Sequence, residues 1–187
     1  MNAKWKEDCR MFAERHKVFI SYYHKDQYYK DIFENCFNDI FINKSVGDGE
    51  INTDVSTDYI KRLIQENYIS DSSVVVVLIG RKTYCRKHVD WEISAGLSKK
   101  VGGYSGLIGI LLPDFPFTPE GKYHFENIPP RLADNVRSDY AKVYSWNWVC
   151  SNQQRIRQAI DEAFQIKNDS PNKIDNSRDQ FLYNRCE

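Results

Sequence analysis

The sequence predicts an α/β fold, a flavodoxin-like three-layer sandwich around a central, mostly parallel five-stranded sheet. Two observations support this. Residues 74–79 (VVVVLI) and 107–112 (LIGILL) are unbroken apolar runs, which are typical of strands buried on both faces of a parallel sheet. Amphipathic helical patterns alternate with such runs across short joins, as in βαβ units with right-handed crossovers.

Local patterns predict where each element lies. The expected strands are 17–23, 51–55, 74–79, 107–112 and 141–146. The expected helices run from a cap at Asp26 to Phe41, from a cap at Ser56 or Thr57 across Ile60, Leu63 and Ile64, from Thr83 to about Lys100 before Gly102 and Gly103, and from a cap at Ser151 to Phe164. Residues 113–139 hold five of the six prolines and are expected to form a long irregular loop.

The length of 187 residues suggests one domain with additions at its ends. Residues 1–16 place Trp5, Cys9 and Phe12 at helical spacing and are expected to form an N-terminal helical extension. Residues 17–166 form the main domain. Residues 167–187 form a polar C-terminal tail, either mobile or a strap whose aromatic residues dock on the domain.

Composition narrows the class of protein. Lys and Arg equal Asp and Glu at 26 each, so bulk charge does not indicate a nucleic-acid partner. No apolar run approaches the roughly 20 residues of a membrane span, and the N-terminus lacks the apolar region of a secretory signal. The five cysteines are widely separated and form no CxxC pair, which predicts neither a zinc site nor a disulfide framework. These features indicate a cytoplasmic protein without metal or membrane partner.

Glu92 is the candidate active-site acid. On a helix with about 100° per residue, it lies between an apolar stripe of Val89, Ile93 and Leu97 and a second stripe of Trp91 and Ala95. Gly96, one turn on, is expected to leave an empty place above the carboxylate. Burial of this kind raises the pKa of a carboxyl group and suits it to acid–base or charge-stabilising work. The positions on the helix alone leave open the alternative that Glu92 is an ordinary exposed glutamate on an amphipathic helix.

A second candidate region follows the first strand. Ser21, Tyr22, Tyr23 and His24 stand where side chains enter the ligand crevice of a parallel sheet, and the rings are suited to stacking on a base or bonding a ribose. The alternative is a tyrosine-rich strand edge with Asp26 as a simple helix cap.

Other nucleotide-binding classes fit less well. The turn Gly47-Asp48-Gly49 is either a flexible lid or a plain turn. Neither GxGxxG nor a P-loop occurs. Receiver domains need acidic residues at the ends of strands one and three, where Ser21-Tyr22 and Gly80-Arg81 stand, and HKDQYY is not a flavin phosphate loop.

Three segments resemble one family. KVFISYYHKD (17–26) resembles the opening strand of a TIR domain, and DSSVVVVLIGRKTYCRKHVDWEI (71–93) resembles its central strand and glutamate-bearing helix. NIPPRLADNVRSDYAKVYSW (127–146) is similar to the prokaryotic TIR-like subunit of the Thoeris anti-phage system. The resemblance spans about Lys17 to Phe164. The chain departs from plant and animal enzymes in having His88-Val89 where Trp-Cys is common, and in lacking an Arg-Asp-x-x-Pro-Gly loop.

The resemblance implies an NAD-consuming enzyme that cleaves the nicotinamide–ribose bond. Glu92 matches the family's catalytic glutamate, and Ser21, Tyr22, Tyr23, His24, Tyr84 and Trp91 are the expected NAD contacts. NAD enters as a substrate. The product would be a cyclic or conjugated ADP-ribose messenger that activates a separate effector, with a phage component as the activator and a homo-oligomer as the active state. A non-catalytic TIR scaffold or a nucleotide-binding module is the alternative.

Overall fold

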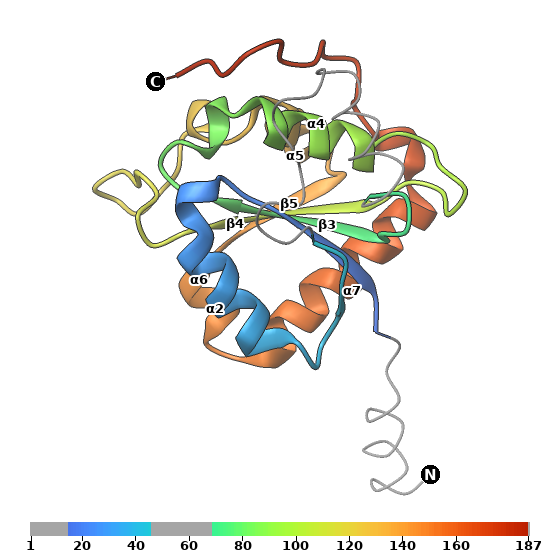
Figure 1. The fold of residues 1–187 in the computed structure, drawn as a ribbon, viewed down its shortest axis with the longest axis horizontal. Helices are drawn as coiled ribbons and strands as arrows, with labels where there is room; N and C mark the ends of the chain where they lie inside the picture. The colour runs from blue at the N-terminus through green and yellow to red at the C-terminus, as the bar shows by residue number, and fades with distance from the viewer. Residues whose placement is uncertain (1–14, 46–68, 187) are drawn as a thin grey trace, which may run out of the picture.

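A computed structural model describes residues 15–45 and 69–186, and its sheet has five parallel strands in the order β2-β1-β3-β4-β5 (Figure 1). The strands are β1 (Lys17–Ser21), β2 (Ile42–Asn43), β3 (Val74–Ile79), β4 (Gly106–Leu111) and β5 (Ala141–Ser145). Every neighbouring pair is parallel, with Val18 opposite Val74 and Val74 opposite Gly106. The predicted α/β fold with a parallel five-stranded sheet is confirmed.

The two apolar runs form the centre of the sheet. Every residue of β3 and β4 is buried, because helices cover both faces of these strands. Gly106 begins β4 where a helix passes very close: a Cβ atom there would lie 2.3 Å from the backbone oxygen of Ala163. The absence of a side chain at Gly106 therefore sets how closely this helix approaches the sheet.

Helices form the two outer layers (Figure 1). One layer contains α2 (Gln27–Phe37), α6 (Trp146–Cys150) and α7 (Gln153–Asp169), which pack against Val18, Ile20 and the same-facing residues of β3 and β4. The other contains α4 (Lys87–Gly96) and α5 (Pro130–Arg137), which pack against Phe19 and the opposite-facing residues. Alternate residues of β1 thus reach different layers, as the two-residue period of a strand requires.

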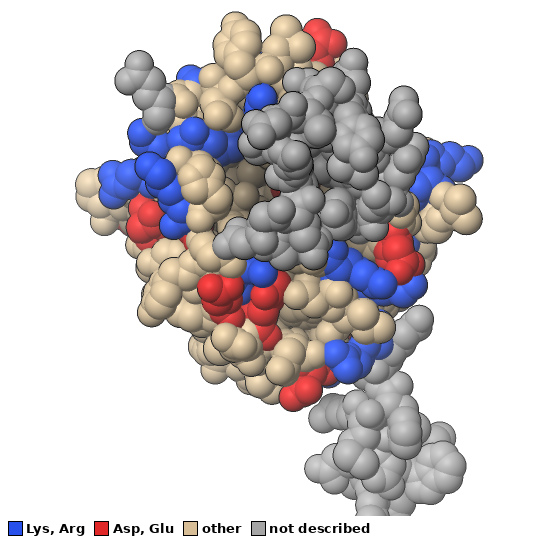
Figure 2. Space-filling view, viewed as in Figure 1, with Lys and Arg blue, Asp and Glu red and all other residues tan. Residues whose placement is uncertain are grey.

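Charged side chains of both signs are interspersed on the face shown in Figure 2. This agrees with the equal totals of basic and acidic residues in the sequence. None of the helices in the described part of the chain combines the length and apolar character that crossing a bilayer requires.

The N-terminal half differs from expectation in the bounds of two elements. Strand β1 ends at Ser21 rather than at Tyr23, because the chain turns into the 3₁₀ helix His24–Asp26. The first helix ends at Phe37 rather than Phe41, and Ile40 and Phe41 are buried from the turn that leads to β2. The described edge strand beside β1 is β2, at Ile42–Asn43. The predicted strand 51–55, the helix across Ile60, Leu63 and Ile64, the turn Gly47–Gly49 and nearly all of the extension 1–16 lie outside the described residues.

The predicted helix from Thr83 to Lys100 is broken into two parts. A short 3₁₀ turn, η3 (Thr83–Cys85), comes first, and Arg86 is extended at φ −90° and ψ 123° before α4 begins. The helix then ends at Gly96, well before Gly102 and Gly103, which form a tight turn with Lys100. The extended residue Arg86 changes the direction of the chain between η3 and α4. Helix α4 therefore starts beside the end of β1, where Arg86 stacks on Tyr23.

The proline-rich stretch 113–139 is not irregular throughout. It contains the 3₁₀ turn η4 (Phe125–Asn127) and then α5, which starts at Pro130. The expectation of a continuous loop was wrong because proline is well tolerated at the first position of a helix, where its missing N–H has no partner to lose.

The end of the main domain also differs in detail. The last strand stops at Ser145, whose side chain caps α6, and Asn152 rather than Ser151 caps α7 by accepting a hydrogen bond from the amide of Gln154. Helix α7 continues past residue 166 to Asp169.

Residues 170–186, called the strap below, run from α7 back across α4 (Figure 1). Near the end of the strap, Phe181 is 1% exposed, whereas its neighbours Leu182 and Tyr183 are 76% and 72% exposed. A disulfide joins Cys85, just before α4, to Cys186 at the end of the strap, 101 residues later. The expectation of no disulfide was wrong for this pair, since spacing along the chain gives no sign of a contact that the strap creates.

Candidate functional site

The end of β1 and the middle of α4 meet at a pair of polar side chains. Ser21 is the last residue of β1 and is completely buried, and it faces the α4 layer, as Phe19 does. Its Oγ donates a hydrogen bond to Oε2 of Glu92 at 2.5 Å. A carboxyl group therefore lies at the carboxyl end of a parallel strand, where ligands of such sheets bind.

The surroundings of Glu92 change its titration. Glu92 keeps part of its surface exposed, but burial raises the pKa of its carboxyl group to about 8, against the opposing effect of the hydrogen bond from Ser21. The loss of hydration disfavours the charged form, and the hydroxyl donor favours it. At neutral pH the unliganded protein thus holds Glu92 mainly protonated, and a nearby positive charge would favour its ionisation.

The helix around Glu92 follows the predicted wheel with one correction. Val89, Trp91, Ile93 and Leu97 are all 3% exposed or less. Gly96, however, does not leave an empty place above the carboxylate. A Cβ atom at this position would lie 2.7 Å from Cγ2 of Val75, so the glycine allows α4 to lie close against β3.

The side chains of the residues after β1 have different neighbours. Tyr22 packs with the α2 layer, and its hydroxyl hydrogen-bonds to Gln27. Tyr23 is 8% exposed, its ring lies 4.4 Å from that of His24, and the guanidinium of Arg86 stacks over it at 4.0 Å. Tyr23 and Arg86 thus join the end of β1 to the start of α4, and His24 is exposed beside them.

The side chain of Trp91, on α4, contacts the strap. It is 1% exposed, its Nε1 donates to the carbonyl oxygen of Phe181 at 2.8 Å, and His88 meets its ring edge at 5.1 Å. Burial lowers the pKa of His88, helped by Lys87 and His24. Tyr84, the remaining predicted contact, lies in η3 and is partly exposed.

A second buried acid lies at the same sheet edge, and the sequence analysis missed it. Asp26 is 8% exposed, and its pKa is raised to about 6 by burial and by the charge of Asp114. Oδ2 of Asp26 accepts from the hydroxyl of Thr83 at 3.3 Å, and that hydroxyl accepts from the amide of Gly80 at 2.9 Å. Asp26 is the N-cap residue of α2, as predicted, but its side chain makes no capping hydrogen bond to an amide of this helix.

The structure also leaves polar atoms near Asp26 without hydrogen-bond partners. Within the described residues, Nη2 of Arg86 and Oδ1 of Asp114 are buried and have no such partner. Both side chains act electrostatically on Asp26, so three charged groups converge beyond the ends of β1, β3 and β4. The sequence signal for this cluster was an acid shortly after one strand and a Gly-x-x-Thr turn after the next.

Across residues 15–45 and 69–186, no group of three or more His, Cys, Asp or Glu side chains is arranged to hold a metal ion. The polar groups described at the site include the acids Glu92, Asp26 and Asp114, the hydroxyls of Ser21 and Thr83, and the stacked pair of Tyr23 and Arg86.

Comparison with known proteins gives one family. The family model described as "Thoeris protein ThsB, TIR-like domain" matches residues 19–115, which is more than half of the chain and includes the end of β1, α4 and both members of the Ser21–Glu92 pair. Among curated proteins none matches. A solved structure titled "Structure of the activated Roq1 resistosome directly recognizing the pathogen effector XopQ (TIR domains)" is similar at 16% identity, with a TM-score of 0.36, over 83% of this chain and 85% of that chain. The chain belongs to the TIR-like domain family of the Thoeris protein ThsB.

Proposed function

We propose that this protein is an NAD-consuming TIR enzyme that cleaves the nicotinamide–ribose bond, with Glu92 as its catalytic residue. The observation that carries the proposal is the Ser21–Glu92 pair, a partly buried carboxyl group held by a hydroxyl at the carboxyl edge of a parallel sheet. Family membership supports it, because TIR domains include enzymes that act on NAD.

The proposed chemistry needs one well-placed negative charge. When the bond between the anomeric carbon of the ribose and the nicotinamide nitrogen breaks, its electron pair leaves with the nicotinamide. The ring becomes neutral, and positive charge develops on the ribose in an oxocarbenium-like state. The carboxylate of Glu92, in surroundings that contain little water, stabilises that charge strongly. Nicotinamide is a good leaving group, so a second carboxylic acid is not required.

The raised pKa of Glu92 fits this substrate. The bound nicotinamide ring carries a positive charge, and an opposite charge within about 4–6 Å lowers the pKa of a carboxyl group. Substrate binding would then ionise Glu92 at neutral pH, while the empty site stays largely neutral. The Ser21 hydroxyl, which donates to Oε2, favours the same ionised form and sets the direction of the carboxylate.

Neighbouring groups supply the rest of an NAD site. Arg86, with one buried nitrogen that lacks a hydrogen-bond partner, has the charge to hold the diphosphate. Tyr23 and His24 lie beside it and offer ring faces and polar atoms for the nucleoside. Tyr22 is partly buried against the α2 layer and Trp91 is buried beneath the strap, so the proposal gives these two residues supporting roles.

The proposed biological role is signalling in anti-phage defence. The product would be an ADP-ribose derivative, cyclic or conjugated, that diffuses in the cytoplasm to a separate effector. The acceptor that meets the ribose carbon decides between hydrolysis, cyclisation and conjugation. A phage component would activate the enzyme, with a homo-oligomer as the active state, because continuous NAD loss would harm the cell.

The test is turnover of NAD by the wild-type protein and by Glu92→Gln, followed by chromatography, with and without lysate from phage-infected cells. Glu92→Gln keeps the size of the side chain and removes the charge, so NAD cleavage should fall at least about 10²-fold. Glu126→Gln, a change at an exposed glutamate of η4, is the matched control and should retain activity. Near-normal turnover by folded Glu92→Gln would remove Glu92 from the mechanism. Silence of the wild type under both conditions would favour a non-catalytic TIR scaffold or nucleotide-binding module.

A further inference from the structure

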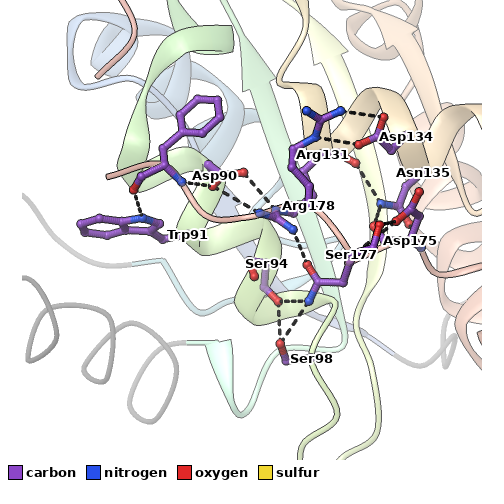
Figure 3. Close-up of polar contacts among 12 residues, drawn as sticks. Asp90, Trp91, Ser94, Ser98, Arg131, Asp134, Asn135, Asp175, Ser177 and Arg178 are labelled. Atoms are coloured by element: carbon purple, nitrogen blue, oxygen red, sulfur yellow. Dashed lines mark hydrogen bonds and ion pairs between the residues drawn. The ribbon is translucent and has the colours of Figure 1, made fainter. Parts of the chain in front are cut away.

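The strap lies along α4 for nearly the whole length of the helix (Figures 1 and 3). Near the C-terminal end of α4, the side-chain amide of Asn176 donates to the backbone oxygen of Ser94 at 3.1 Å and to the hydroxyl of Ser98 at 3.3 Å. Near its start, the amide of Arg185 donates to the carbonyl oxygen of Cys85 at 2.9 Å. The strap therefore runs antiparallel to α4 and is fastened at both ends.

Phe181 is the central attachment. Its backbone amide donates to Oδ2 of Asp90 at 2.9 Å, and its backbone oxygen accepts from Nε1 of Trp91 at 2.8 Å. Its own side chain is 1% exposed, with the guanidinium of Arg185 over the ring at 3.8 Å. One strap residue thus holds the two residues that come immediately before Glu92.

Asp90 also connects the strap to α5. Arg131, which is completely buried, donates to Oδ1 of Asp90 at 2.9 Å and to Oδ2 at 3.4 Å (Figure 3). Nη1 of Arg131 donates to the side-chain oxygen of Asn176 at 2.7 Å. A buried carboxylate with three donors has little freedom to move, so Asp90 fixes α4 against both α5 and the strap.

The strap also supplies the missing cap of α4. The N-cap residue, Arg86, makes no side-chain capping bond, whereas Oδ1 of Asn184 accepts from the amide of Lys87 at 3.1 Å. Asparagine is among the best capping side chains when it stands at the N-cap itself. Here the same group satisfies the first amide of the helix from 97 residues away.

These contacts lie on the side of α4 that faces away from the sheet, and Glu92 meets Ser21 on the side that faces β1. A side-chain end group is about 5–6 Å from a helix axis, so a rotation of about 10° moves it by about 1 Å. Displacement of a catalytic group by 1 Å is sufficient to lower a rate by about 10²-fold. A change of about 10° in the rotation of α4 would therefore be enough to impair a catalytic group on this helix.

We propose that Phe181 is a positioning residue: through Asp90 and Trp91, it sets the rotation of α4 and holds the Glu92 carboxyl against Ser21. The catalytic part of this inference rests on the proposed function. The structural part does not, because the position of Glu92 is measurable without turnover.

The test compares Phe181→Ala with two controls in the full chain. Ile174→Ala removes a partly buried strap residue that packs on the same core and makes no hydrogen bond to Asp90 or Trp91 through its side chain. It therefore controls for a general loss of stability. Leu182→Ala changes the exposed neighbour. Phe181→Leu refills most of the space and is the conservative rescue. Each variant is studied by carboxyl ¹³C NMR titration of Glu92, assigned with Glu92→Gln, and by hydrogen exchange of the α4 amides.

Phe181→Ala keeps the backbone groups that bond Asp90 and Trp91 but removes the buried ring that anchors them. Faster exchange along α4 is therefore expected, together with a Glu92 pKa that moves toward the ordinary value as water reaches the carboxyl group. The exchange rates of the α4 amides and the pKa of Glu92 should return toward wild-type values in Phe181→Leu. Both quantities should stay near wild type in the two controls. In activated protein, kcat for NAD should fall at least about tenfold with little change in KM. An unchanged Glu92 titration in folded Phe181→Ala would overturn the positioning role, and so would an equal change in Ile174→Ala. An inactive wild type would refute the proposed function while leaving the titration result to decide the positioning.

Discussion

Ser21 and Glu92 are 71 residues apart in the chain, and the hydroxyl of the first lies 2.5 Å from a carboxyl oxygen of the second. The pair joins the end of β1 to the second turn of α4 and is enclosed enough to raise the pKa of Glu92 to about 8. Two opposing influences act on one group, since burial favours the neutral acid and the hydroxyl favours the carboxylate. Measurements that vary pH therefore report directly on this site.

The first prediction concerns the pH dependence of NAD turnover. If the ionised form of Glu92 acts in catalysis, kcat/KM should rise about tenfold per pH unit below the pKa of about 8 and level off above it, because kcat/KM reports the titration of the free enzyme. Initial rates between pH 6 and 9 on the activated protein would measure this. A profile that is flat across this range, while the protein stays folded, would contradict the assignment.

The second prediction concerns Ser21. Ser21→Ala removes the hydrogen bond that lowers the pKa of Glu92, so the rise in kcat/KM should move to higher pH. Activity at pH 7 should fall more than activity at pH 9. Ser177→Ala, on the exposed part of the strap, is the control and should leave the profile in place. An equal loss at every pH would mean that Ser21 acts by some route other than titration of Glu92.

The third prediction is that Glu92 lowers the stability of the fold at alkaline pH. Its folded pKa of about 8 exceeds the ordinary value of 4.5, so the folded state binds the proton more tightly than the unfolded state does. This contribution is fully present below pH 4.5 and is lost as pH rises to about 8. Since one pKa unit corresponds to about 1.4 kcal/mol, wild type should become less stable than Glu92→Gln by a few kcal/mol.

Urea unfolding of both proteins from pH 4 to 9 would measure the difference. The two free energies of unfolding should be similar near pH 4 and diverge up to about pH 8, with the glutamine variant the more stable. Curves that run parallel across this range would show that the pKa of Glu92 is not raised in the folded protein.

The fourth prediction concerns the buried ion pair between Asp90 and Arg131. Both side chains are 2% exposed or less, so Arg131→Leu leaves an uncompensated buried carboxylate and should cost about 3–5 kcal/mol of unfolding free energy. The double variant Arg131→Leu, Asp90→Leu removes both charges and should recover a large part of that loss. Urea unfolding of the single and double variants at pH 7 measures the coupling. Additive losses would show that the two side chains do not stabilise each other.

The sheet was the part of the fold most readily predicted from sequence. Val74–Ile79 was recognised because a strand buried on both faces needs no alternation of polar residues, and Glu92 followed from its place in the helix after that strand. The start of α5 at Pro130 was missed because the same residue type that disrupts a helix interior is favoured at its first position.

The contacts of Asp26 and Phe181 around the candidate site could not be predicted from hydrophobic pattern. The sequence predicts Asp26 as a helix cap, and only the approach of Thr83, in the turn η3 after β3, gives its side chain a different hydrogen-bond partner. Phe181 stands in a polar segment without periodicity, where hydrophobic pattern carries little information. Its partners, Asp90 and Trp91, are 91 and 90 residues away.

The distances along the chain between the strap and α4 have a consequence for the order of folding. The i→i−4 bonds of α4 close short loops, whereas the bonds from Asn176, Phe181 and Asn184 close loops of 78 to 97 residues. Long loops cost more entropy to close and are formed later when their contacts are few. With the Cys85–Cys186 disulfide reduced, the strap is therefore expected to dock after the sheet and α4 have formed and to be the first part to detach under mild denaturant. The molecule would then pass through a native-like species whose β-sheet is complete while the helix that carries Glu92 is still free to turn.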